Sequence, residues 1–426
     1  MNYEDAINYI CSTPWTTRER GHMRILELLS KLGNPQDRCR YIHIAGTNGK
    51  GSTSAMLASV LETAGYKTGL FTSPHLIKYN ERMKINGVDV SDEELAELMT
   101  RIAPVADAME VSPSEYELLT AAAFLWYAEN ECDIVVLEVG MGGELDSTNV
   151  IGSKEAAVIT AIGYDHMAIL GNTLEEITST KAGIITGPYD VVMYSQADNI
   201  MTVVRDKCSE MKAEMHIADS SVIHVVNRCI DYQEFESPYL NGTVKLPLMG
   251  DYQLKNVTTV LETCKVLKAK GYRMDDDIVR RGLENTKWAT RFEVVHKHPV
   301  IIIDGAHNEQ GINAAVESLN SLFPEKKIIF ILGVLSDKSF DKMLEILYPK
   351  AERFITLTPD SPRALKGSEL ARIINDAGQT AEDFESIDDA VRYAIDRSGK
   401  DGIICSLGSL YLAGNIREAV KRVTEE

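Results

Sequence analysis

Residues 43–57 read HIAGTNGKGSTSAML, and this stretch decides the fold. An apolar run ends at Ala45, three glycines then surround Lys50, and small hydroxyl residues open a helix-like segment. A strand that runs through glycines into a helix gathers free backbone N–H groups and a positive dipole end, which attract phosphate. The fit to G-x-x-x-x-G-K-[ST] is imperfect because Gly51 separates Lys50 from Ser52. The stretch is therefore either a phosphate cradle or a glycine turn that starts a helix.

Apolar β-branched runs alternate with amphipathic stretches along nearly the whole chain, which predicts an α/β fold built from βα units around mostly parallel sheets. A more antiparallel patch at 222–248 precedes a long helix that begins near Tyr252. A new strand-helix series begins at Val300, so we predict two domains, 1–297 and 298–426. The predicted strands are 41–45, 133–139, 156–162, 190–195, 300–304, 327–333, 353–357 and 402–407, and the predicted helices are 52–64, 92–108, 198–212, 309–322 and 409–424.

The composition favours a cytosolic globular protein. The chain has 426 residues, of which 44% are hydrophobic and 25% are charged, and its formal net charge is −19. That charge disfavours nucleic acid and anionic lipid as partners. We expect no transmembrane helix and no signal peptide. The seven cysteines lie far apart with no C-x-x-C pair, which favours buried free thiols over disulfides or zinc.

Polar residues follow several of the predicted strands. Ser73 ends the strand GLFTS, and the loop at 74–87 carries His75, Glu81 and Arg82; this loop is either a substrate or metal contact or an exposed connection. Glu138 lies within the apolar strand 133–139, where an unpaired carboxylate is costly, so a metal ligand is favoured.

Further polar residues come after the strands at 133–139 and 156–162. Asp146, Thr148 and Asn149 form a cluster suited to ligand contact or to Asx-type turns. The preceding glycines lack the G-x-G-x-x-G spacing of a nicotinamide site. His166, next to Asp165, is a core histidine or a ligand of Mg²⁺, which prefers hard oxygens with at most one imidazole.

The distal half repeats the arrangement. Asp304, His307 and Asn308 follow the strand VIIID, although Asn308 could simply cap the next helix. Arg291, in the segment before that strand, is a ligand contact or a surface arginine, and Lys181 on its own is a solvated helix lysine.

Twelve collinear motifs give the chain a specific resemblance. They are LGNPQ (32–36), HIAGTNGKGS (43–52), TSPHL (72–76), NERMKING (80–87), EYELLTAAAF (115–124), EVGMGGELDSTNVI (138–151), GYDHMAILG (163–171), KAGI (181–184), LMGDYQLKN (248–256), TRFEV (290–294), DGAHN (304–308) and GSLYLAGNIR (408–417). With them the chain resembles the folylpolyglutamate synthase and dihydrofolate synthase family of Mur-type ATP-dependent amide ligases. The short G-x-x-G-K-G-S loop is the form that this family uses.

The resemblance implies a P-loop-type ATPase domain, a smaller Rossmann-like C-terminal domain and an active site between them. It also implies roles for matching residues, four of them catalytic: Lys50, Lys181, His166 and His307. Residues implied to bind ATP are Thr47, Asn48, Gly49, Lys50, Gly51, Ser52, Asn256, Arg291 and Asp304. Residues implied to bind Mg²⁺ are Ser73, Glu138, His166 and Lys181, the last as a carbamate at a second metal site. Residues implied to bind substrate are Arg82, Tyr116, Glu117, Asp146, Thr148, Asn149, His307 and Asn308.

The implied reaction joins L-glutamate to a folate, or to dihydropteroate, through an acyl phosphate, with release of ADP and phosphate. A potassium ion is a further candidate cofactor, and a monomer is expected. Tyr116 replaces a commoner Phe, and Asp251-Tyr252 departs from some members. One rival is a Mur ligase for a cell-wall nucleotide precursor, although only 42 residues precede His43, too few for a UDP-binding domain. Another is a small-molecule kinase or a nucleotide-gated binding protein.

Overall fold

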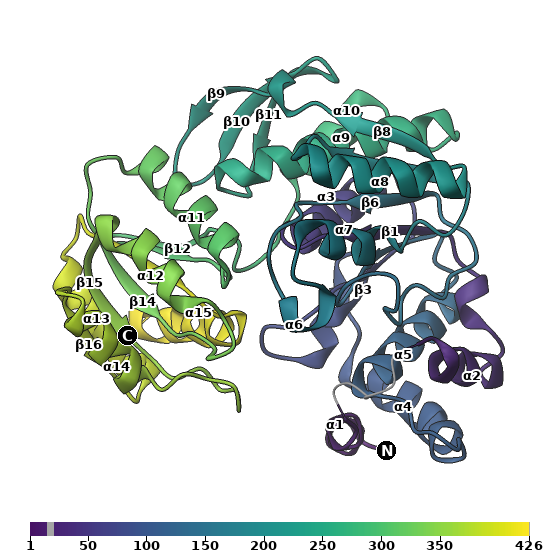
Figure 1. Ribbon diagram of the computed structural model, residues 1–426, viewed down its shortest axis with the longest axis horizontal. Coiled ribbons are helices and arrows are strands. Elements are labelled where there is room, and N and C mark those ends of the chain that lie inside the picture. Colours follow the sequence, from purple (N-terminus) through teal and green to yellow (C-terminus); the bar gives the residue numbers. More distant parts are fainter. Residues whose placement is uncertain (15–20, 426) are drawn as a thin grey trace. The chain divides into compact units, whose positions relative to one another are not determined.

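The computed structural model of the protein describes residues 1–14 and 21–425, which form two compact units (Figure 1). The first unit comprises Met1–Ile223, Ser237–Gly242 and Lys255–Thr286, and the second comprises His224–Glu236, Thr243–Leu254 and Lys287–Glu426. The chain thus enters the second unit three times. A division at one point of the sequence, such as the one after residue 297, stays a prediction.

The first unit is built on an eight-stranded sheet with the order β4-β3-β2-β5-β1-β6-β7-β8. The strands from β2 to β8 along this order run parallel, and β3 is antiparallel to both β2 and β4. The strands of this sheet are β1 (Tyr41–Ala45), β2 (Thr68–Phe71), β3 (Met83–Ile85), β4 (Val88–Asp89), β5 (Ile134–Glu138), β6 (Ala156–Ile159), β7 (Asp190–Tyr194) and β8 (Glu214–Ala218).

Helices cover this sheet. Helix α3 packs on β2, β5 and β1 and against α10, while α7 and α8 lie side by side (Figure 1). Strand β1 is buried along its whole length, as expected of a strand covered on both faces. The helical elements of this unit are α1 (Tyr3–Ser12), α2 (Met23–Lys31), η1 (Pro35–Asp37), α3 (Lys50–Thr63), η2 (Tyr79–Arg82), α4 (Asp92–Asp107), α5 (Glu115–Glu129), α6 (Met167–Leu170), α7 (Leu174–Ala182), α8 (Asp198–Met211), η3 (Ser220–Val222) and α10 (Asp276–Glu284). Helix α9 (Asp251–Ala269) contributes residues to both units.

The second unit contains a six-stranded sheet with the order β12-β13-β17-β14-β15-β16, parallel except for β12. Alternate residues of β14 enter two different cores: Phe330 packs with one set of helices and Ile331 with the other. Its elements are β12 (Glu293–Lys297), β13 (Val300–Ile303), α11 (Glu309–Leu322), β14 (Ile328–Leu332), α12 (Phe340–Leu347), η4 (Tyr348–Lys350), β15 (Ala351–Thr356), α13 (Gly367–Asp376), β16 (Ala381–Asp383), α14 (Ile387–Ser398), β17 (Ile403–Leu407) and α15 (Leu410–Glu425). A separate three-stranded sheet has the order β11-β10-β9, with β9 (His224–Arg228), β10 (Gln233–Ser237) and β11 (Leu240–Leu246).

The predicted α/β fold is confirmed, including the antiparallel patch at 222–248 and the helix near Tyr252. The prediction of a long loop at 74–87 is wrong, because this segment contains η2 and β3. The reason is the Asn86-Gly87 turn, in which both residues have positive φ (49° and 75°), the conformation that joins the two strands of a tight hairpin. All seven cysteines are free thiols, as predicted, but the expectation that they are buried holds only for Cys132, Cys208, Cys264 and Cys405; Cys11 is exposed, and Cys39 and Cys229 are partly buried. In the described ranges, no helix has the length and apolarity that crossing a membrane requires.

Candidate functional site

The loop between β1 and α3 leaves the start of that helix open. Helix α3 begins at Lys50, and its N-cap is Gly49, with φ +87° and no side chain to bond the first N–H groups. Two hydrogen bonds fix this loop to the segment after β6: the Thr47 and Asn48 amides donate to the Ala161 carbonyl at 2.7 and 3.2 Å. An uncapped helix start with a glycine-rich approach is suited to bind an anion.

Two side chains converge on this loop. Lys50 Nζ folds back to donate to the Thr47 carbonyl at 3.2 Å. A Cβ at Gly49 would lie 2.5 Å from Asn256 Oδ1, so only glycine allows the buried Asn256 to come this near. The structure therefore brings together two predicted nucleotide-binding elements that are about 200 residues apart in the sequence.

A buried carboxylate stands at the carboxyl end of the neighbouring strand. Glu138 is the last residue of β5 and is 4% exposed. The Ser73 amide lies 3.3 Å from Glu138 Oε2, so these two predicted metal ligands are adjacent. His166 follows β6 in a left-handed conformation (φ 50°), and its amide donates to Asp165 Oδ1 at 2.8 Å.

Lys181 is buried beside the glycine-rich loop that precedes α3, which excludes the interpretation as a solvated lysine. Its Nζ donates to the Gly46 carbonyl at 2.8 Å, and the residue is 4% exposed. Burial, followed by repulsion from Lys50, lowers the pKa of Lys181 to about 7. A large fraction of its amine is therefore neutral, and hence nucleophilic, near neutral pH.

The cluster after β5 is a buried hydrogen-bond network. Asp146 accepts from the Met141 and Thr148 amides and from the Thr148 hydroxyl, which in turn contacts His43 Nε2 at 2.8 Å. Asn149 donates to the Glu144 and Gly183 carbonyls. The Asx-type turn is thus present, and the assignment of Asp146, Thr148 and Asn149 to substrate stays a prediction.

The sequence analysis missed Lys154. Its Nζ donates to Asn149 Oδ1 at 2.9 Å, to the Ile184 carbonyl and to Thr186 Oγ1 at 3.2 Å. Burial lowers the pKa of Lys154 to about 7. This lysine ties the network after β5 to the segment that follows α7. Its sequence context, GSKEA, resembles an exposed turn and holds no signal of burial.

The remaining predicted substrate residues of the first unit also have partners within the chain. Arg82 Nε donates to His75 Nδ1 at 3.0 Å, and burial followed by the Arg82 charge lowers the pKa of His75 to about 3. Glu117 forms the capping box of α5 with Ser114 and an ion pair of 3.1 Å with Arg24. The partly buried Tyr116 packs against Gly140, where a Cβ would lie 2.6 Å from the phenol oxygen.

In the second unit, Asp304 organises the segment around Arg291. Asp304 is 3% exposed and accepts from the Phe292 amide (2.8 Å), the Ala306 amide (2.7 Å) and the Tyr252 hydroxyl (2.8 Å). Arg291 Nη1 donates to the Thr290 carbonyl at 3.0 Å.

The two residues that follow this segment make local contacts. His307 Nδ1 lies 2.8 Å from the Gly305 carbonyl, and Asn308 caps α11 by accepting from the Gly311 amide at 2.8 Å. The capping role of Asn308 is thus present in the structure, and ligand contacts by His307 and Asn308 stay predictions.

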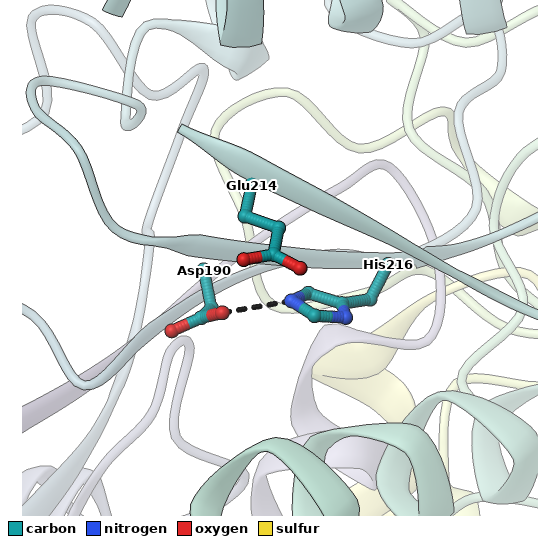
Figure 2. Close-up of side chains that lie close together, drawn as sticks. All are labelled: Asp190, Glu214 and His216. Carbon is teal, nitrogen blue, oxygen red and sulfur yellow. Dashed lines mark hydrogen bonds and ion pairs between the residues drawn. The ribbon is translucent and has the colours of Figure 1, made fainter. Parts of the chain in front are cut away.

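A different group of metal-ligand side chains lies at the opposite, amino end of the parallel strands. Asp190 begins β7, Glu214 begins β8, and Figure 2 shows them with His216, all with ligand atoms within 4.8 Å of one another. His216 Nε2 lies 2.7 Å from Asp190 Oδ1, but Lys270 Nζ already lies 2.7 Å from Asp190 Oδ2. Burial raises the pKa of Asp190, yet the bonds and charges of Lys270 and His216 outweigh it, and the net shift is downward. A lysine therefore supplies the positive charge, and the cluster fastens the end of α9 to the sheet.

The fold and the glycine-rich loop before α3 agree with the class of Mur-type ligases. The Mur ligase middle domain family matches residues 44–264, and the Mur ligase glutamate ligase domain family matches residues 290–410. A dihydrofolate synthase/folylpolyglutamate synthase of Bacillus subtilis is 34% identical over 98% of this chain and 99% of its own length. The folylpolyglutamate synthase of Mycobacterium tuberculosis, solved with ADP and AMPPCP, is 30% identical, has a TM-score of 0.86, and the match covers 100% of this chain and 98% of that one. A complex of a folylpolyglutamate synthase with AMPPCP and folate has 31% identity, a TM-score of 0.83 and coverage of 99% and 100%. The chain belongs to the folylpolyglutamate synthase and dihydrofolate synthase family, which confirms the resemblance stated above.

Proposed function

We propose that this protein is an ATP-dependent ligase that adds L-glutamate to a folate, as a folylpolyglutamate synthase. Dihydropteroate is the second proposed acceptor, because the Bacillus subtilis relative carries the name of both activities. The observation that carries the proposal is the uncapped start of α3 beside Lys50 and Lys181, in a chain of this family.

Several residues are proposed to bind the nucleotide. The first unit would hold the phosphates with the loop from Thr47 to Ser52, and Lys50 would leave its present carbonyl partner to contact the outer phosphates. Asn256 would approach the same loop across Gly49. In the second unit, Arg291 has a guanidinium suited to a phosphate, and Asp304 would contact the nucleotide.

A magnesium site fits the side chains at the carboxyl end of β5. Magnesium prefers oxygen ligands, and the buried Glu138 carboxylate lies next to Ser73, which carries a hydroxyl. We assign Glu138, Ser73 and His166 to this ion and Lys181, as a carbamate, to a second one. Bound Mg²⁺ would neutralise phosphate charge. The buried amine of Lys181, whose pKa is about 7, meets the requirement of carbamylation for a neutral amine.

The acceptor and glutamate are assigned to the remaining predicted residues. The pterin side would involve the buried Glu117 and Arg82 and the partly buried Tyr116 of the first unit. The substrate-binding surface beside these residues would be formed by Asp146, Thr148 and Asn149. His307 and Asn308 of the second unit would contact the incoming glutamate.

The proposed reaction has two steps that balance. A carboxylate oxygen of the folate attacks the γ-phosphorus of ATP, the bond to the β,γ-bridging oxygen breaks, and ADP leaves. The amine of L-glutamate then attacks the acyl phosphate, loses a proton, and expels phosphate as the amide forms. The residues position reactants and offset negative charge, as is usual in phosphoryl transfer.

A substrate panel tests the proposal. ADP release is measured with tetrahydrofolate, dihydropteroate or a UDP-linked muramyl acid as acceptor, with and without L-glutamate. The masses of the products are determined by mass spectrometry. We expect glutamate-dependent ADP release and a product heavier by one glutamyl residue. ADP release that needs no glutamate would indicate a kinase, and turnover only with the muramyl acid would indicate a cell-wall ligase. Sedimentation at assay concentration checks the expected monomer.

A further inference from the structure

A strained turn of the second unit carries Arg291. Thr290 and Phe292, the residues on either side of it, both have positive φ (55° and 52°), and both side chains are fully buried. Non-glycine residues rarely adopt this conformation, and a bulky residue such as phenylalanine does so only when its surroundings impose it. The backbone that presents Arg291 is therefore held by other groups.

Two carboxylates hold this turn through its backbone amides. Glu293 Oε2 accepts from the Thr290 amide at 2.9 Å, and Asp304 Oδ2 accepts from the Phe292 amide at 2.8 Å. The Gly305 amide donates to the Thr290 carbonyl at 2.9 Å. The hydrogen bonds that hold the backbone of Thr290 and Phe292 thus come from Glu293 and from the segment 304–305.

Tyr252 is the side-chain group that orients Asp304. Its hydroxyl donates to Asp304 Oδ2 at 2.8 Å, the same oxygen that receives the Phe292 amide, while the Ala306 amide occupies Oδ1. Tyr252 is partly buried, and burial followed by the charge and hydrogen bond of Asp304 raises its pKa well above the usual value. The phenol therefore remains a proton donor to Asp304 across the physiological pH range.

The position of Arg291 depends on this arrangement. A Cβ at Gly305 would lie 2.3 Å from Arg291 Nη1, so the guanidinium crosses directly over the residue next to Asp304. In the described chain its hydrogen bonds go to Thr290 alone, at 3.0 and 3.4 Å. Most of its five donors are therefore available to an anion.

We propose that Tyr252 is a positioning residue for Arg291: by orienting Asp304 it fixes the turn that aims the guanidinium at nucleotide phosphate. This inference rests on the proposed function, in which Arg291 contacts ATP. The link runs from Tyr252 through Asp304 and the Phe292 amide to Arg291.

Tyr252→Phe removes one oxygen atom and tests the link. We expect the KM for ATP to rise about tenfold, because the loss of one hydrogen bond to a charged group typically weakens binding by about this factor. The kcat should change less than threefold. Tyr393→Phe is the matched control, because it also removes a hydroxyl bonded to a carboxylate of the second unit, Glu382, and it should leave the KM unchanged.

A double-mutant cycle distinguishes positioning from general weakening of the fold. In an Arg291→Ala background, Tyr252→Phe should raise the KM for ATP by a clearly smaller factor, because only the contact of Asp304 with the nucleotide is then left to disturb. Equal effects in both backgrounds would overturn the proposal, and so would an unchanged KM in Tyr252→Phe. If Arg291→Ala alone leaves the KM unchanged, the proposed role of Arg291 fails instead. Kinetics are compared at a temperature at which the near-UV circular dichroism of all variants matches.

Discussion

The two units present their basic residues on loops of opposite construction. In the first unit, the loop before Lys50 reaches positive φ through Gly46 and Gly49, and the lack of a Cβ also allows close approach to Thr160 and Asn256. In the second unit, Thr290 and Phe292 adopt positive φ without being glycine, and the carboxylates of Glu293 and Asp304 hold them there. The conformation of the first loop thus depends on glycines, which lack a Cβ, whereas that of the second depends on the side chains that bond its backbone.

Lys50→Ala tests whether the glycine-built loop carries the chemistry. We expect kcat for glutamate-dependent ADP release to fall by a factor of about 10² to 10³, because removal of one group that offsets transition-state charge typically costs about 3 to 4 kcal/mol. The fold should persist, since among the described residues Lys50 Nζ bonds only the Thr47 carbonyl. Lys31→Ala is the control, an exposed lysine paired with Glu27. Turnover near that of the unaltered enzyme would refute the assignment.

Gly49→Ala tests the close approach that only glycine permits. The new Cβ would lie 2.5 Å from Asn256 Oδ1, and we expect kcat/KM to fall about 100-fold, the cost of a displacement of about 1 Å in an active site. Gly271→Ala is a matched control, because Gly271 has a similar φ (+92°) but no atom within 4 Å of its Cβ position. Both variants should lose about 1 to 2 kcal/mol of unfolding free energy in chemical denaturation. Equal kinetics for the two would show that contact with Asn256 is irrelevant.

Replacing Lys181 tests whether the enzyme stays active when the amine that bonds the glycine-rich loop at Gly46 is lost. Its amine, now bonded to the Gly46 carbonyl, has a pKa lowered to about 7, so it becomes neutral as the pH rises through 7. Carbamate forms from the neutral amine and carbon dioxide, and we therefore expect activity to rise roughly tenfold between pH 6 and pH 8 and with added bicarbonate. The response should disappear in Lys181→Met and persist in Lys265→Met, a surface control. Carbon-13 NMR of enzyme in labelled bicarbonate detects the carbamate, and a missing signal together with bicarbonate-independent activity would contradict the assignment.

The same contrast explains how much could be predicted from the sequence. Glycine spacing and apolar runs are local, so the strand, loop and helix around Lys50 could be predicted, as could most strands of both sheets. The turn around Arg291 could not, because its conformation depends on Asp304 and Tyr252, which are far from it in the sequence. Lys154 was missed for the same reason, since its partner at Ile184 lies 30 residues away.

Glu293→Gln tests the weaker of the two carboxylates that hold the second loop. Glu293 accepts from the Thr290 amide and pairs with Arg417 Nε at 3.0 and 3.1 Å, at a partly exposed position. An amide keeps one acceptor oxygen but loses the charge, so we expect a loss of about 0.5 to 1 kcal/mol, a Tm lower by about 1 to 2 °C, and a KM for ATP raised about threefold. Asp388→Asn weakens a comparable pair with Arg422 and should lower the Tm without raising the KM. If the KM rises equally in both variants, general stability governs nucleotide binding, and not the turn at Thr290–Phe292. The two loops would then differ in backbone conformation alone.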